Sequence, residues 1–171
     1  MVEKFISIEL ELCLLINRLC DYRICRSFFA AISRLGDGIF WYTLMLILPF
    51  IYGIAVWTVS ITMAITSLSG LLVYKLIKSQ TERPRPYAVN KQINLGTAPL
   101  DKYSFPSGHT LHAVSFTVIA VYHFPELGWI LIPFSTLVAI SRVLLGLHYP
   151  TDVAAGALIG SVLGAIAVTL L

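Results

Sequence analysis

The sequence predicts an all-α membrane protein, a polytopic helical bundle of about six transmembrane helices that forms a single domain over residues 1–171. Hydrophobic residues make up 57% of the chain and charged residues only 12%, against about 45–50% and about 25% in soluble domains. So few charges cannot cover the surface of a soluble protein of this size. The longest uncharged run, Ile39–Tyr74, also exceeds one membrane crossing. The net charge of +3 is too small, and the basic residues too local, to indicate a nucleic-acid partner.

The run Ile39–Tyr74 predicts two spans. As one helix it would measure about 54 Å at 1.5 Å per residue, nearly twice a hydrocarbon core of roughly 30 Å. A turn is therefore expected over Gly53–Thr58. Three further segments have the length of a span, and prolines mark the breaks between them; they are Ser107–His123, Gly128–Leu147 and Thr151–Leu171.

The N-terminal stretch Glu3–Cys20 is apolar but carries Glu9, Glu11 and Arg18. A charge at the centre of a membrane helix costs about 2.5–3.5 kcal/mol, so the stretch is either a packed span or a helix in the membrane interface. We favour a span, which brings the count to six, with Arg23–Gly38 as an amphipathic connector.

Two polar loops interrupt this pattern, Ser79–Pro106 after the third span and Gly146–Pro150 after the fifth. Because two spans separate them, both loops are expected on the same side of the membrane. Polar segments far apart in the sequence can then contribute to one site.

The residues of these segments predict an anion site. Lys78, Arg85 and Arg142 offer charge-assisted donors, and arginine can bind phosphate oxygens in bidentate fashion. Ser107 and Gly108 open a helix, where free backbone N–H groups favour an anion. Such donors would stabilise the negative charge of a phosphoryl group in its transition state.

The same segments contain candidates for the reacting groups. Pro150 places Asp152 in the first turn of the last helix, where its carboxylate can accept from one ring nitrogen of His148 and leave the other free to attack phosphorus. His109 can protonate the leaving oxygen as a general acid.

Each segment also has a structural alternative. Lys78 and Arg85 can be interfacial charges, Ser107 and Gly108 a helix cap, and His148 an interfacial histidine. Their convergence on one face favours the functional interpretation.

The chain resembles the type 2 phosphatidic acid phosphatase superfamily, which includes bacterial lipid phosphatases and vanadium-dependent haloperoxidases. Its signatures are Lys-x6-Arg-Pro, Pro-Ser-Gly-His and Ser-Arg-x5-His-x3-Asp. They stand here unaltered, as Lys78 to Pro86, Pro106 to His109, and Ser141 to Asp152.

The resemblance implies a two-step mechanism without metal or cofactor, in which His148 forms a phosphohistidine, Asp152 orients it and His109 assists departure of the lipid. It implies as phosphate ligands Lys78, Arg85, Ser107, Gly108 and Arg142. Arg83 and His112 match no motif position, and we interpret them as a loop charge and a helix-packing residue.

The resemblance further implies a lipid phosphate as substrate and membrane lipids as surroundings. Undecaprenyl pyrophosphate is our first choice, ahead of phosphatidylglycerophosphate, phosphatidate and a lipid A phosphate. More remote alternatives are a vanadate-dependent haloperoxidase and a non-enzymatic lipid-binding protein. The count of positive charges would place the site in the cytoplasm, whereas the resemblance implies a bacterial cytoplasmic (inner) membrane with the site facing the periplasm or exterior; we follow the resemblance.

Overall fold

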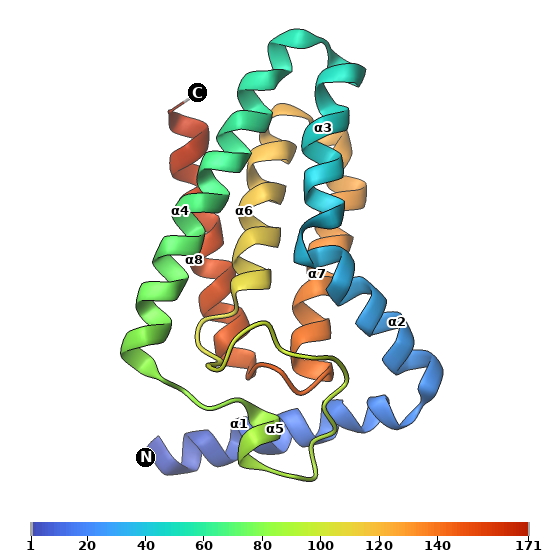
Figure 1. Cartoon of the computed structure of the whole chain (residues 1–171), viewed down its shortest axis with the longest axis vertical. Coiled ribbons are helices and arrows are strands. Elements are labelled where there is room, and N and C mark those ends of the chain that lie inside the picture. Colours follow the sequence, from blue (N-terminus) through green and yellow to red (C-terminus); the bar gives the residue numbers. More distant parts are fainter. Residues whose placement is uncertain (1, 171) are drawn as a thin grey trace.

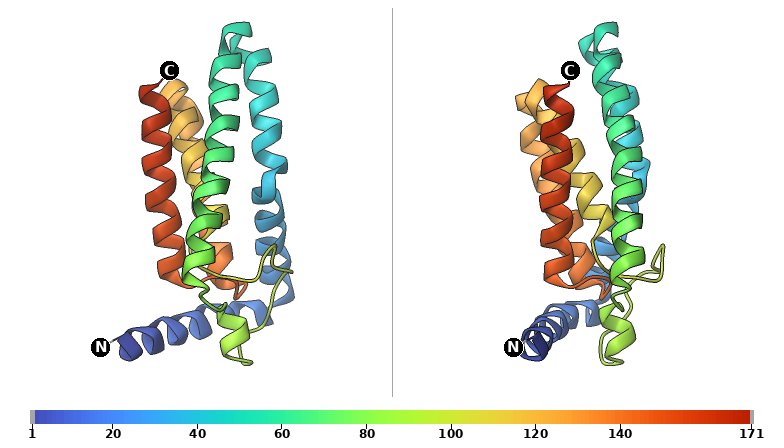
Figure 2. Two further views of the ribbon diagram at one scale, coloured as in Figure 1. Left: turned by 60° about the vertical axis from the view of Figure 1, so that its left-hand side comes forward. Right: turned by 90° about the vertical axis from the view of Figure 1, so that its left-hand side faces the viewer.

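The computed structural model describes residues 2–170, and the side chains of residues 6–170. Met1 and Leu171, which bound the expected domain and its last span, lie outside this range. The described elements are all helical; the α-helices are α1 (Val2–Asn17), α2 (Arg23–Arg34), α3 (Phe40–Tyr52), α4 (Trp57–Thr81), α5 (Pro86–Val89), α6 (Gly108–His123), α7 (Gly128–Leu144) and α8 (Pro150–Thr169). Four of them (α3, α4, α7 and α8) surround α6 in one elongated bundle (Figures 1 and 2).

The uncharged run divides as predicted. Helix α3 ends at Tyr52, and Gly53 and the 3-10 turn Ile54–Val56 connect it to α4. The outer surface carries large apolar side chains, with Phe50, Ile54 and Trp129 each more than 80% exposed. Such a surface is stable against hydrocarbon rather than water. The chain is therefore a membrane protein.

The count of six spans is not confirmed. Helix α1 lies across one end of the bundle instead of running along it (Figure 1). In this orientation Glu11 and Arg18 remain exposed, while the buried Glu9 forms an ion pair with Arg83. The interfacial alternative therefore describes α1 better than a span, because a helix lying in the interface can keep its charged side chains in water.

The segment expected as an amphipathic connector forms α2, an amphipathic helix that continues into α3. The π-helical turn Leu35–Ile39 joins α2 to α3, and Arg23–Tyr52 has the length and hydropathy of a membrane span. Within residues 2–170 the other segments with these properties are Ile54–Val89, Pro125–Leu144 and Pro150–Thr169. Helix α6, at 16 residues, is shorter. Its surroundings are the other helices of the bundle.

Glycines in α8 allow its backbone to pack directly against the backbone of α6. A Cβ atom on Gly160 would lie 2.4 Å from the carbonyl oxygen of Leu111, and one on Gly156 would lie 2.5 Å from that of Ser107. Small residues at such spacing allow two membrane helices to approach closely. At the same end of the pair, the Ser107 N–H donates to the carbonyl of Asp152 at 3.0 Å. The first turns of α6 and α8 are thereby held together.

Candidate active site

Both polar loops lie at one end of the bundle, as the span count predicted (Figure 1). A cavity of about 470 Å³ opens there and extends between α3, α4 and α6. Six of the eight predicted site residues line it: Lys78, Arg85, Gly108, His109, Arg142 and His148. Asp152 and Ser107 lie behind these residues, each with no exposed surface.

His148 follows the turn that ends α7. Gly146 adopts φ 74°, a conformation that suits glycine, and the backbone then folds back so that the His148 N–H donates to the Arg142 carbonyl at 3.0 Å. Its Nε2 lies 3.2 Å from Nη1 of Arg85. Because a guanidinium can only donate, Nε2 is the acceptor, and the ring proton is assigned to Nδ1. Burial, and then the positive charges of Arg142 and Arg85, hold the pKa of His148 well below its ordinary 6.5. The imidazole is therefore neutral at pH 7, with its Nε2 lone pair directed at Arg85 in the cavity wall.

Asp152 approaches the other ring nitrogen. Its Oδ2 lies 3.6 Å from Nδ1 of His148, an ion-pair distance that is longer than a hydrogen bond. The same oxygen accepts from the Tyr149 N–H at 2.8 Å, while Oδ1 accepts from Nη1 of Arg83 at 2.7 Å. Two fixed donors thus orient the carboxylate toward the histidine.

Lys78 and Arg85 share one anion, the carboxylate of Asp101. Nζ of Lys78 lies 2.8 Å from each carboxylate oxygen, and Nη2 of Arg85 lies 2.7 Å from Oδ1. Burial acts to raise the pKa of Asp101, but the hydrogen bond and charge of Lys78 and the charge of Arg85 outweigh it, and the pKa lies below its ordinary value. This corner of the cavity accommodates a negatively charged group.

Arg142 and His109 complete the polar part of the cavity. Arg142 donates to the Ser33 hydroxyl, and its Nε has no hydrogen-bond partner within the described part of the chain. His109 contacts the Asp37 carboxylate through Nε2. A basic and a titratable group therefore face the same space as His148.

Ser107 is the predicted ligand that the structure does not bring to the cavity wall. Its hydroxyl is the N-cap of α6, where it accepts from the Thr110 N–H and contacts the Thr110 hydroxyl at 3.0 Å. The capping alternative describes this side chain, whereas the neighbouring Gly108 does line the cavity.

Sequence reasoning missed several polar partners. Arg83, interpreted as a loop charge, forms ion pairs with both Asp152 and Glu9. His112 packs against Phe116, as expected, and also lines the cavity. Asp37 and Asp101 were not singled out. The available signal was chemical: a carboxylate in a largely apolar membrane chain is expensive unless it has a partner.

Comparison with known proteins identifies a family and several relatives of the chain. The family model described as the PAP2 superfamily matches residues 46–171. Undecaprenyl-diphosphatase BcrC of Bacillus subtilis is 32% identical over 100 residues, which cover 58% of this chain and 51% of that protein. The chain spans about half the length of the curated relatives it matches.

Two crystal structures share the fold over nearly the whole chain. Aquifex aeolicus LpxE superposes with a TM-score of 0.81 at 28% identity, covering 94% of both chains. The PAP2-type phosphatidylglycerolphosphate phosphatase of Bacillus subtilis superposes with a TM-score of 0.73 at 27% identity, covering 99% of this chain and 85% of the other.

Proposed function

This chain belongs to the PAP2 superfamily, and we propose that it is a membrane phosphatase that removes phosphate from a lipid. The observation that carries the proposal is the two-part cavity. One end presents Lys78, Arg85 and Arg142, and the other presents apolar side chains such as Leu68 and Leu71. A lipid phosphate has the same division, with a charged head and an apolar tail.

The apolar part reaches the outer surface of the bundle. Tyr42 of α3 and Leu68 of α4 line the cavity, and they are 60% and 61% exposed. Figure 2 shows these two helices side by side along one flank of the bundle. A lipid tail can therefore remain in hydrocarbon while its phosphate reaches the cationic end, without crossing water.

The proposed reaction begins with displacement of Asp101 from Lys78 and Arg85 by the phosphate oxygens. This displacement also frees Nε2 of His148 from Arg85, since Nη1 can then donate to phosphate. Nε2 attacks phosphorus, the bond from phosphorus to the lipid oxygen breaks, and His109 donates a proton to that oxygen. The proton on Nδ1 of His148 faces Asp152, which stabilises the positively charged ring.

Water completes the cycle. His109, now unprotonated, accepts a proton from a water molecule that attacks the phosphohistidine, and the N–P bond breaks to release inorganic phosphate. Arg142 and the backbone at the start of α6 stabilise the negative charge on the phosphoryl oxygens in both steps.

We propose undecaprenyl pyrophosphate as the substrate to test first, supported by the name of the Bacillus subtilis relative. A pyrophosphate leaving group is also more acidic than a lipid alkoxide, so its departure depends less on His109. The name of the solved Bacillus subtilis neighbour supports phosphatidylglycerophosphate as a rival. A Rhizobium johnstonii relative named as a lipid A 1-phosphatase supports a lipid A phosphate, and phosphatidate is a further rival. We place the protein in a bacterial cytoplasmic membrane, with its active site facing the periplasm or exterior.

The test is phosphate release by the purified full-length chain from a panel of these lipids, without added metal. We expect release from at least one lipid, inhibition by vanadate, and loss of release in His148→Ala. Lys91→Ala, an exposed loop residue, is the matched control and should behave as wild type. A His148→Ala protein that releases phosphate at the wild-type rate would overturn the proposal.

A further inference from the structure

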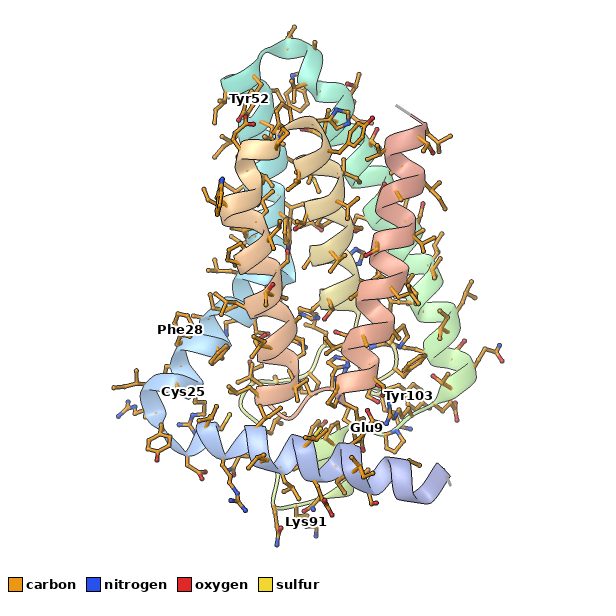
Figure 3. The ribbon with its side chains drawn as sticks, turned by 180° about the vertical axis from the view of Figure 1, so that it is seen from behind. Glu9, Cys25, Phe28, Tyr52, Lys91 and Tyr103 are labelled. Carbon is orange, nitrogen blue, oxygen red and sulfur yellow. The ribbon has the colours of Figure 1, made fainter. Side chains whose placement is uncertain are left out.

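A second polar cluster lies behind His148, outside the cavity. It joins Arg83, from the loop after α4, to Glu9 of α1 and to the first turn of α8 at Thr151 and Asp152. Figure 3 places Glu9 on α1 at the end of the bundle, beside the start of α8. None of these four residues lines the cavity, so the cluster has no direct contact with a substrate there.

Arg83 uses its guanidinium to connect two carboxylates. Nη1 donates to Oδ1 of Asp152 at 2.7 Å and to the Thr151 hydroxyl at 2.9 Å. Nη2 donates to Oε2 of Glu9 at 2.6 Å. The guanidinium also lies over the Tyr149 ring, 3.9 Å from its centroid. These contacts fix the arginine on several sides.

Both carboxylate oxygens of Glu9 accept hydrogen bonds within the same cluster. Its second oxygen, Oε1, accepts from both the N–H and the hydroxyl of Thr151, at 3.0 Å and 2.6 Å. The residue is only 4% exposed. A buried carboxylate is costly unless charges and hydrogen bonds compensate its desolvation, and apolar residues could attach α1 to the bundle without that cost. The pairing therefore indicates a role beyond attachment.

We propose that Arg83 and Glu9 are positioning residues for the catalytic pair: Glu9 holds Arg83, and Arg83 holds Oδ1 of Asp152 so that Oδ2 faces Nδ1 of His148. The assignment rests on the proposed function. Its physical basis is that the carboxylate has two oxygens: Arg83 pairs with Oδ1, which leaves Oδ2 as the oxygen nearest Nδ1 of His148.

The proposal predicts a specific pattern of kinetic effects. Arg83→Ala should lower kcat by about 10–100-fold, by analogy with the loss when a residue that orients a metal-binding side chain is removed. KM should change by less than about twofold, because the cavity ligands are untouched. Arg83→Lys should be intermediate, since an ammonium cannot reproduce the planar fork that reaches both carboxylates. Glu9→Gln should lower kcat less than Arg83→Ala does.

Chemical rescue separates positioning from a general structural role. The Arg83 side chain is 22% exposed, so methylguanidine can reach the space vacated in Arg83→Ala. We expect added methylguanidine to restore part of kcat in Arg83→Ala and to leave wild type unchanged. Glu11→Gln, an exposed carboxylate on the same helix, and Arg23→Ala are matched controls and should retain wild-type kinetics.

Combining the substitutions tests whether Glu9 acts through Arg83. The double variant Glu9→Gln/Arg83→Ala should be no slower than Arg83→Ala alone, because the intermediary is already absent. If the two effects instead multiply, the coupling is refuted.

The outcomes distinguish this assignment from the proposed function. A wild-type protein that releases no phosphate from any lipid overturns both. An active wild type, with a folded Arg83→Ala that keeps its kcat or loses activity through KM alone, overturns the assignment only. If Arg83→Ala does not fold, Arg83→Lys and Glu9→Gln carry the test, and wild-type kcat in both overturns it.

Discussion

Replacement of Asp101 by asparagine tests whether this carboxylate occupies the position of the phosphate. In the resting protein it contacts Lys78 and Arg85 at 2.7–2.8 Å, so a phosphate that binds these cations must displace it. Asparagine has nearly the same shape but no charge. We therefore expect the Asp101→Asn protein to bind inorganic phosphate more tightly than wild type.

The size of the effect follows from the contacts. A hydrogen bond to a charged group contributes about 1.5–3 kcal/mol when buried. The Asp101 side chain is 38% exposed, so solvent screens these contacts, and we reduce their combined contribution to about 1–2 kcal/mol. At 1.4 kcal/mol per factor of ten, the inhibition constant of inorganic phosphate should fall by about 5–30-fold.

The assay is inhibition of lipid dephosphorylation by added inorganic phosphate, with vanadate measured in parallel. Asp21→Asn is the control, since it removes a carboxylate that lies on the surface and bonds to Asn94. An unchanged or higher inhibition constant in Asp101→Asn would refute the reasoning. It would show that Asp101 holds the two cations in place for phosphate instead of competing with it.

Three further predictions concern other parts of the molecule. Because burial and neighbouring cations lower the pKa of His148 well below 6.5, the acid limb of kcat/KM from this group should lie below pH 6.5, and a limb at or above that pH would contradict it. Gly160→Ala places a Cβ atom 2.4 Å from a carbonyl oxygen of α6 and should destabilise the protein by about 1–3 kcal/mol, measured as a lower thermal midpoint in detergent. Gly128→Ala is the control, because the nearest atom to its Cβ would be 3.6 Å away. Asp37→Ala removes the partner of His109 and should reduce kcat about tenfold more for a phosphomonoester than for a pyrophosphate, and equal losses would argue against His109 as the acid.

The sequence was sufficient to predict the positions of those helices and site residues that belong to contiguous sequence patterns. The lengths of the apolar segments located α3, α4, α7 and α8. Because two predicted spans separate the two polar loops, both loops were expected at one end of the bundle. The convergence of Lys78, Arg85, Arg142 and His148 could be predicted because each lies in one of the two polar loops or within about one helical turn of it. The same reasoning could not separate the capping role of Ser107 from phosphate binding, since both use a serine at a helix start.

The missed features depend on tertiary partners. Glu9 and Arg83 are 74 residues apart, and no local sequence pattern relates them. Asp37 pairs with His109 only because the π-helical turn brings it beside α6. The orientation of α1 could not be predicted because hydropathy describes an interfacial helix and a packed span almost equally well. Its position across the end of the bundle, with Glu11 and Arg18 exposed, distinguishes them.

Under the proposed function, the exposed rim of the cavity between α3 and α4 makes turnover depend on the substrate concentration within the membrane instead of that in water. A ligand that enters from the bilayer, past Tyr42 and Leu68, diffuses in the plane of the membrane. Its effective concentration is therefore its mole fraction among the surrounding lipids, rather than its molarity in water. Adding detergent or inert phospholipid at a fixed amount of ligand should therefore slow turnover by dilution within the membrane. Saturation curves measured at different lipid contents should coincide only when plotted against surface mole fraction.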